Sequence, residues 1–240
     1  MNSLIQNTVS FFEKRIASRQ LFATSSRGDT IVSGYSFLSN ENRHEPLPED
    51  CDRHQVGIFY ADIVNYSGLT EQDEEGTHHR LVESMKIMEA YITANNGRVV
   101  HTAGDAILAE FKDVDSALQC AVNVQLAARE LNARFHINQR VLFRIGVNYG
   151  DVIADNGEIY GNAVNLAARL EKLANRGGIC VSESVRSELE GNAAFNFVPL
   201  GKRYVKNISE PVQAFWIEID AQQVVDAGFT SSLKVPAMAS

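Results

Sequence analysis

The stretch "VVHTAGDAILAEF", residues 99–111, sets two apolar, strand-like runs on either side of a short turn. The turn residues "AGD" between "RVVHT" and "AILAEF" are typical of a β-hairpin. Asp105 lies at the tip of this hairpin, where an isolated carboxylate is costly to remove from water. Its place indicates either a residue that caps the turn or a ligand of a shared cation.

A further strand is predicted for "QVGIFYADIV", residues 55–64, which is rich in strand formers. Successive side chains of a strand point to opposite faces, so Tyr60 and Asp62 share a face. A carboxylate on such a strand either accepts backbone N–H groups or shares a hard cation with Asp105. Mg²⁺ suits the second case, since it takes one or two carboxylates and completes its octahedron with water and phosphates. The faces expected are Ile58, Tyr60 and Asp62 on one side, and Phe59, Ala61 and Ile63 on the other.

Helices and further strands alternate along the rest of the chain. The helix over residues 70–97 carries one apolar stripe, and Asp113 or Asp115 caps the next helix, 113–135. A third helix, 161–178, ends at Gly177. Residues 141–155 are predicted to form a strand pair that pivots near Gly150. This order predicts an α+β fold with a mainly antiparallel sheet. The remaining expected elements are strands 178–183, 195–200 and 212–219 and a short helix, 183–191; the stripe is Leu81, Met85, Met88 and Ile92.

The organisation predicted is an N-terminal helix and extended connector over 1–54, a compact domain over 55–220 and a tail over 221–240. The net charge of −8 argues against a broad nucleic-acid surface. No run reaches the about 18 to 20 apolar residues that span a bilayer, and no secretory leader is recognisable. Cys51, Cys120 and Cys180 form neither a disulfide framework nor a metal motif, so a cytoplasmic protein is expected.

Cationic and amide side chains provide the remaining candidates. Asn165 and Arg169 in "NAVNLAARL" stand at i and i+4, on one helix face. A guanidinium there suits phosphate oxygens and the amide can orient a ribose, although a solvated surface pair is the alternative. Arg144, flanked by apolar strand residues, requires an anionic partner. Lys206 is ambiguous by itself.

Five segments in order resemble the class III nucleotidyl cyclase catalytic domain: "FYADIVNYSGLT", "GDAILAEF", "FRIGVNYGDV", "IYGNAVNLAARLE" and "VKNISEPV". The resemblance implies a ferredoxin-like α+β domain that pairs head to tail as a homodimer, with the active sites in the interface. It also implies that Asp62 and Asp105, helped by the backbone carbonyl of Ile63, bind two Mg²⁺ or Mn²⁺ ions.

The same resemblance assigns the substrate contacts. Arg144 would contact the triphosphate from the same protomer, and Lys206 would hold the terminal phosphates. The second protomer would supply Asn165 to orient the ribose and Arg169 to stabilise charge on the α-phosphate. The reaction implied is attack by the ribose 3′-oxygen on the α-phosphorus, which yields a 3′,5′-cyclic nucleotide and pyrophosphate.

The positions that would read the base depart from the usual adenylate cyclase pattern. His101 stands where a Lys is usual, Glu158 where an Asp or Thr is usual, and Tyr60 where an apolar residue is usual. The altered pocket looks like that of the bacterial pyrimidine cyclases of anti-phage signalling, which make cyclic UMP or cyclic CMP for a cyclic-nucleotide-sensing effector. UTP is the expected substrate, ahead of CTP. An adenylate cyclase with a variant pocket and a catalytically degenerate regulatory module are the alternatives.

Overall fold

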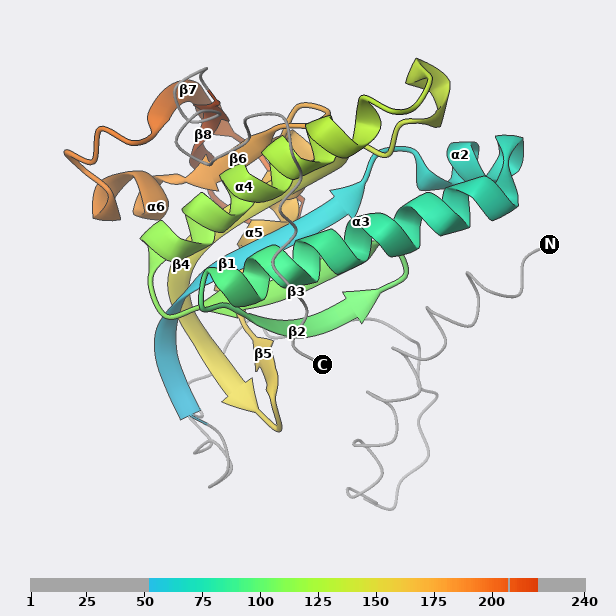
Figure 1. The fold of residues 1–240 in the computed structure, drawn as a ribbon. Helices are drawn as coiled ribbons and strands as arrows, with labels where there is room; N and C mark the ends of the chain where they lie inside the picture. The colour runs from blue at the N-terminus through green and yellow to red at the C-terminus, as the bar shows by residue number, and fades with distance from the viewer. Residues whose placement is uncertain (1–51, 207, 220–240) are drawn as a thin grey trace, which may run out of the picture. The chain divides into compact units, whose positions relative to one another are not determined.

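The computed structural model describes residues 52–206 and 208–219, all of which belong to one compact unit (Figure 1). The predicted N-terminal helix, most of the connector, Cys51 and the tail over 221–240 lie outside the described residues. The first strand begins at Asp52, three residues before the predicted start of the domain.

The described residues form one sheet of eight strands, in the order β2–β3–β1–β4–β6–β8–β7, with β5 paired to β4. Every pairing is antiparallel except that of β4 with β6. The predicted α+β fold with a mainly antiparallel sheet is thereby confirmed. The strands are β1 Asp52–Ile63, β2 Arg98–Ala103, β3 Ala106–Phe111, β4 Phe143–Asp155, β5 Glu158–Tyr160, β6 Ile179–Ser182, β7 Asn196–Arg203 and β8 Val212–Glu218.

The prediction of a strand pair within residues 141–155 was wrong, because β4 is one continuous strand. Its partner β1 is nearly as long, and the two stay in register from Asp52 opposite Ala154 to Ile63 opposite Phe143. Gly150 is an ordinary member of this ladder. The chain turns instead at Asn156 and Gly157, both of which have positive φ (50° and 81°). An Asn-Gly pair adopts such a turn with little strain, and it leads directly into β5.

Two long helices, α3 (Glu74–Ala94) and α4 (Val114–Asn132), lie against one face of the sheet, and α5 (Asn162–Leu173) lies against the other (Figure 1). Two short helices, α2 (Tyr66–Gln72) and α6 (Glu183–Glu188), complete the set together with a 3₁₀ turn over Ile137–Gln139. The prediction that Asp113 or Asp115 caps α4 is confirmed, because the Asp113 carboxylate accepts from the Ser116 N–H at 2.7 Å.

Two helix boundaries differ from the prediction. The helix expected over 70–97 is divided at Asp73, whose carboxylate accepts from the Gly76 N–H and caps α3. The helix expected to end at Gly177 ends at Leu173. The Gly177 N–H donates to the Phe143 carbonyl of β4, so the chain has already left the helix to enter the sheet as β6.

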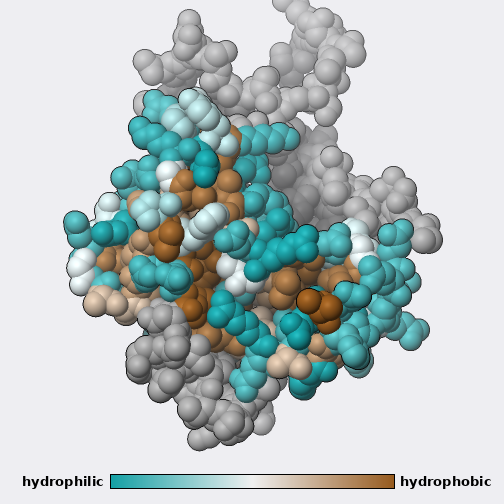
Figure 2. Space-filling view, turned by 90° about the horizontal axis from the view of Figure 1, so that it is seen from above, coloured by the Kyte–Doolittle hydropathy of each residue, from teal (hydrophilic) through white to brown (hydrophobic). Residues whose placement is uncertain are grey.

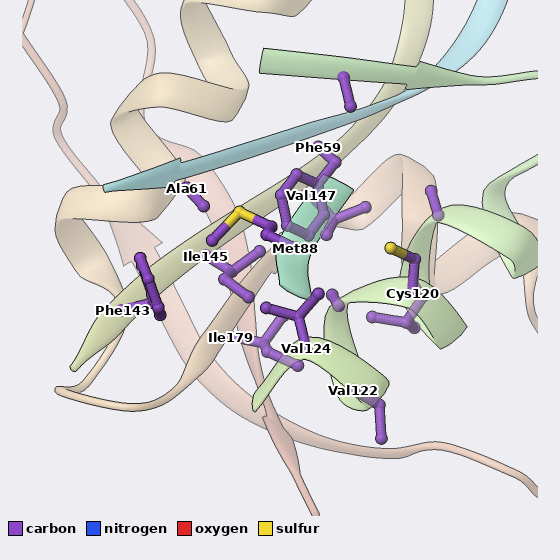
Figure 3. Close-up of a cluster of buried hydrophobic side chains, with 14 of the residues drawn as sticks. Phe59, Ala61, Met88, Cys120, Val122, Val124, Phe143, Ile145, Val147 and Ile179 are labelled. Carbon is purple, nitrogen blue, oxygen red and sulfur yellow. The ribbon is translucent and has the colours of Figure 1, made fainter. Parts of the chain in front are cut away.

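The alternation predicted for β1 is confirmed. Phe59, Ala61 and Ile63 are buried under α3 and α4 in one large core. Figure 3 shows part of this core, with Phe59 and Ala61 labelled. Ile58 is buried on the other face, where Tyr60 packs beside it against residues of α5. Burying a Phe or Ile side chain contributes about 1.5–3 kcal/mol. The alternation therefore determines which face Asp62 occupies. The α3 stripe is also confirmed: Leu81, Met88 and Ile92 are buried and Met85 packs against them.

The surface of the described unit is mixed. Figure 2 shows hydrophobic side chains gathered near the middle of the face seen from above, with hydrophilic side chains around them. Tyr204 and Ile137 are the most exposed of the large hydrophobic residues described, at 82% and 77%. Among residues 52–206 and 208–219, no helix combines the length and apolar character needed to cross a bilayer.

Candidate active site

The end of β1 and the β2–β3 turn bring the two candidate metal carboxylates together. Asp62 lies next to last in β1, and Ala61 before it pairs with Ile107 of β3, two residues after Asp105. Gly104, with a φ of 64°, makes the turn that presents Asp105. Burial, and then the nearby charge of Asp62, raise the pKa of Asp105 to about 6. The two candidate metal carboxylates therefore lie close enough to interact electrostatically.

The donor set fits a hard divalent cation. A cation between Asp62 and Asp105 would relieve the mutual repulsion that raises the pKa of Asp105. Ile63 follows Asp62 as the last residue of β1, so its backbone carbonyl is the nearest main-chain oxygen in sequence. Within the described ranges, no group of three or more His, Cys, Asp and Glu side chains is arranged to hold a metal. Two carboxylates with backbone and water are a ligand set that Mg²⁺ accepts.

A network of charges that the sequence analysis did not foresee surrounds Asp62. The Lys172 ammonium donates to Asp62 Oδ2 at 2.6 Å. It also lies 2.9 Å from Glu171 Oε2, as an ion pair without hydrogen-bond alignment. Arg144 Nε donates to the other oxygen, Glu171 Oε1, at 2.7 Å. The Glu171 side chain is completely buried, so these two cations supply the compensation that a buried carboxylate requires.

Arg144 therefore has the anionic partner that its position required, but that partner is Glu171 and belongs to the protein. Arg144 lies directly opposite Asp62 in the β1–β4 ladder, and a quarter of its side chain is exposed. Burial raises the pKa of Glu171, and Lys172 and Arg144 oppose that increase. The arrangement leaves the guanidinium at the strand position opposite Asp62 while its Nε is held by Glu171.

A glycine in β4 explains how α5 reaches this network. A Cβ added at Gly146 would lie 2.1 Å from the Ala167 carbonyl oxygen and 2.5 Å from the Glu171 nitrogen. Only a residue without a side chain lets the helix backbone come so near the sheet. The signal for Glu171 was present in the sequence, since it falls four residues after Ala167 and beside Leu170 on the buried stripe of α5.

The predicted transition-state pair lies on α5, one turn apart. Asn165 is exposed, and Arg169 is partly buried. Arg169 Nε donates to the backbone carbonyl of Lys206 at 3.2 Å. The structure thus brings together Arg169 and Lys206, two predicted phosphate-binding residues that are far apart in sequence.

The three candidate base-reading residues lie near the β2 edge of the sheet. Tyr60 and His101 both pair with Leu108 of β3, so they stand in one row across three strands. His101 Nδ1 lies 3.6 Å from Glu158 Oε1, and each side chain is about one third exposed (27% and 33%). Burial, and then the charge of Asp62, raise the pKa of Tyr60, which keeps its hydroxyl protonated.

An arginine holds Glu158 close to β2. Arg98 Nη1 donates to the Gly157 carbonyl at 2.6 Å, and its Nε donates to Glu110 at 2.8 Å. The β4–β5 turn is therefore hydrogen-bonded to the side chain of Arg98, the first residue of β2. A register shift between Val99 and His101 marks a bulge that sets the position of His101.

Comparisons with known proteins agree on the family. The protein-family model described as the adenylate and guanylate cyclase catalytic domain matches residues 50–219 of this chain. The chain is 36% identical over 165 residues to putative adenylate cyclase 3 of Rhizobium meliloti (strain 1021), covering 68% of this chain and 28% of that protein. It is 28% identical over 142 residues to an adenylate cyclase of Streptomyces coelicolor, covering 59% of this chain and 36% of that protein. The chain therefore spans well under half the length of these curated relatives.

Solved structures show the same relationship. An adenylate/guanylate cyclase/hydrolase from Silicibacter pomeroyi is 34% identical, with a TM-score of 0.66, covering 71% of this chain and 99% of that one. The adenylyl cyclase CyaB from P. aeruginosa, at 20% identity, shares the fold with a TM-score of 0.61, covering 72% of this chain and 98% of that one. The chain belongs to the family of adenylate and guanylate cyclase catalytic domains.

Proposed function

We propose that this protein is a nucleotidyl cyclase that converts a nucleoside triphosphate to its 3′,5′-cyclic nucleotide and pyrophosphate. The observation that carries the proposal is the meeting of Asp62 and Asp105 at the end of β1, where burial and mutual repulsion call for a shared cation. Membership in the cyclase family supports it, as does the presence of Asn165, Arg169 and Lys206.

Asp62, Asp105 and the Ile63 carbonyl would hold two Mg²⁺ or Mn²⁺ ions. Bound there, the ions supply charge neutralisation at the attacking and leaving oxygens of a displacement at phosphorus. The side chains of the protein position the substrate. Arg144 and Lys206 bind the triphosphate, Asn165 orients the ribose, and Arg169 stabilises charge that develops on the α-phosphate. Such contacts act by placement and electrostatics, which require no covalent step by the protein.

The active unit we propose is a head-to-tail homodimer. Each site would combine the two aspartates of one protomer with Asn165 and Arg169 of a second copy of the chain. Asn165 is exposed on α5, as a residue that completes a neighbouring site must be. A two-fold arrangement in which both copies retain every residue gives two equivalent sites.

For the base, we propose a pyrimidine, with UTP preferred over CTP. The contact of His101 with Glu158 supports this choice, since a paired imidazole has a shorter reach and a different donor pattern from a free Lys. Tyr60, whose raised pKa preserves its O–H, is suited to stack on a small base or to donate to a base oxygen. The product would be a second messenger for a cyclic-nucleotide-sensing effector in antiviral defence.

The second candidate is an adenylate cyclase with a variant pocket. The names of two relatives, in Rhizobium meliloti and Streptomyces coelicolor, favour it. In that case Glu158 would accept from the adenine amino group. Replacing His101 by Lys separates the two candidates. A pyrimidine enzyme loses turnover of UTP, whereas an adenylate cyclase keeps or gains turnover of ATP.

Cyclase activity itself is tested by pyrophosphate release from each of ATP, GTP, CTP and UTP in the presence of Mn²⁺. Asp62→Ala should abolish release, and the exposed Asp151→Asn on β4 is the matched control. Absence of metal-dependent release with all four nucleotides would favour the third candidate, a degenerate regulatory module.

A further inference from the structure

Lys172 lies on the same face of α5 as the proposed transition-state pair, three residues after Arg169 and seven after Asn165. It points back to its own protomer's carboxylates, with Nζ 2.6 Å from Asp62 Oδ2 and 2.9 Å from Glu171 Oε2. The distance to Asp62 is that of a short, charge-assisted hydrogen bond. Lys172 therefore contacts one of the two carboxylates proposed to bind metal.

The charges of the cluster show what this contact does. Three carboxylates meet here: Asp62, Asp105 and Glu171. Arg144 is hydrogen-bonded to Glu171, whereas Lys172 donates to Asp62. On the proposed function, a divalent cation must bind this same oxygen-rich position. An ammonium and a divalent cation cannot both lie against one carboxylate without strong repulsion.

We propose that Lys172 is a tethered counter-ion of the metal site, which occupies the cation position on Asp62 and which a divalent cation must displace. The inference rests on the proposed metal role of Asp62. It explains how the protein can keep three carboxylates close together without metal, because the Lys172 ammonium offsets the repulsion among them. It also raises the metal concentration required for binding, since each binding event must break the Lys172–Asp62 contact.

The structure permits the displacement. Half of the Lys172 side chain is exposed (52%), and its flexible stem lets the ammonium turn to water. Glu171 stays compensated when Lys172 leaves, since Arg144 keeps its own hydrogen bond to Oε1. A partly exposed ion pair is also weak, so a metal ion bound by two carboxylates can replace it.

The test is the affinity of the full-length, nucleotide-free protein for Mn²⁺, measured by electron paramagnetic resonance of the free ion. Lys172→Met should lower the Kd for Mn²⁺ about three- to tenfold, since the competing cation is gone. Lys172→Arg should stay near the wild type. Lys86→Met is the matched control, because it removes the same charge from an exposed position on α3, across the sheet. It should leave the Kd unchanged.

A second readout is thermal stability. Lys172→Met should melt below the wild type without metal and gain more from added Mn²⁺. An unchanged or higher Kd in Lys172→Met, with measurable binding to the wild type, overturns the inference and leaves the proposed function standing. Mn²⁺ binding by the wild type that persists in Asp62→Asn overturns the proposed metal role, and the inference with it. An equal decrease of the Kd for Mn²⁺ in Lys86→Met would show an effect of net charge alone, and it would also overturn the inference.

Discussion

Asp62 and Arg144 stand directly opposite each other on β1 and β4, yet neither is the other's hydrogen-bond partner in the charge network. Asp62 accepts from Lys172, and Arg144 donates to Glu171. The two partners, Glu171 and Lys172, are consecutive residues of α5. One helix therefore compensates the charges of side chains on two strands. The site is built across the sheet and the helix, and its electrostatics depend on how closely α5 approaches β4.

The approach of α5 to the sheet can be tested at Gly146. Gly146→Ala places a Cβ within 2.1 Å of the Ala167 carbonyl oxygen. The helix must move, and we expect a loss of about 2–3 kcal/mol in the free energy of unfolding, measured in urea. Gly150→Ala, on the same strand, is the control, because its Cβ would meet only side-chain atoms, the Ala163 Cβ at 3.2 Å and Asn148 Nδ2 at 3.9 Å. Equal losses in the two variants would contradict the proposed contact.

The buried carboxylate of α5 should matter far more than a surface one. Glu171→Gln leaves Arg144 without its anion, and we expect a loss of about 3 kcal/mol in the free energy of unfolding. Glu83→Gln is the control, because it breaks an exposed ion pair with Arg134 whose distance, 2.8 Å, is close to the 2.7 Å of the Arg144–Glu171 pair. Exposed pairs contribute about 0–1 kcal/mol, so this control should unfold close to the wild type. Similar values for both would show that burial of Glu171 has no energetic consequence.

The raised pKa of Asp105 predicts a pH dependence of stability. The folded-state pKa, about 6, exceeds the ordinary value of 3.8, so the folded protein holds this proton more tightly than the unfolded chain. Its contribution to stability is complete below the ordinary pKa and is lost as the pH rises through about 6. Without metal, Asp105→Asn should therefore be more stable than the wild type at pH 7.5, by about 1 kcal/mol after solvent screening.

Melting temperatures of the two proteins from pH 4 to pH 7.5 check this prediction. The advantage of Asp105→Asn should shrink as the pH falls, and Mn²⁺ should raise the melting temperature of the wild type alone at pH 7.5. An Asp105→Asn variant that is less stable than the wild type at pH 7.5 without metal would show that the carboxylate is stabilised by the protein itself.

Much of this architecture could be predicted from local pattern. The alternation in β1 fixes the face of Asp62 because a one-residue shift would expose Phe59 and Ala61. The hairpin around Gly104 and the Asp113 cap follow from turn and capping chemistry, which acts over a few residues. The Asn156-Gly157 dipeptide is also a turn signal in the sequence. Placing the turn there, and not at Gly150, would have predicted β4 as one continuous strand.

The charge network could not be predicted in the same way. Lys172 and Asp62 are 110 residues apart, and their contact exists only because Gly146 admits α5 to the sheet. Periodicity marks Glu171 as buried, but it does not say which cations compensate it. The contact of His101 with Glu158 is similar, since it depends on the bulge in β2 and on Arg98 fastening the β4–β5 turn.

The proposed base-reading residues give a prediction of their own. Glu158→Gln removes the carboxylate that contacts His101 and should lower kcat/KM for the preferred nucleotide about tenfold or more, because the contact that we propose to discriminate the base is lost. Glu188→Gln, an exposed acid at the end of α6, is the control and should leave kcat/KM unchanged. Steady-state kinetics with each nucleotide separate the two, and an unaffected Glu158→Gln enzyme would remove this residue from base recognition.

We propose that Tyr60, His101 and Glu158 together select a pyrimidine base in a nucleotidyl cyclase reaction. The most direct measurement is mass spectrometry of the products formed by the purified protein from an equimolar mixture of ATP, GTP, CTP and UTP with Mn²⁺. We expect cyclic UMP as the main product, with less cyclic CMP. Cyclic AMP as the dominant product would contradict this proposal.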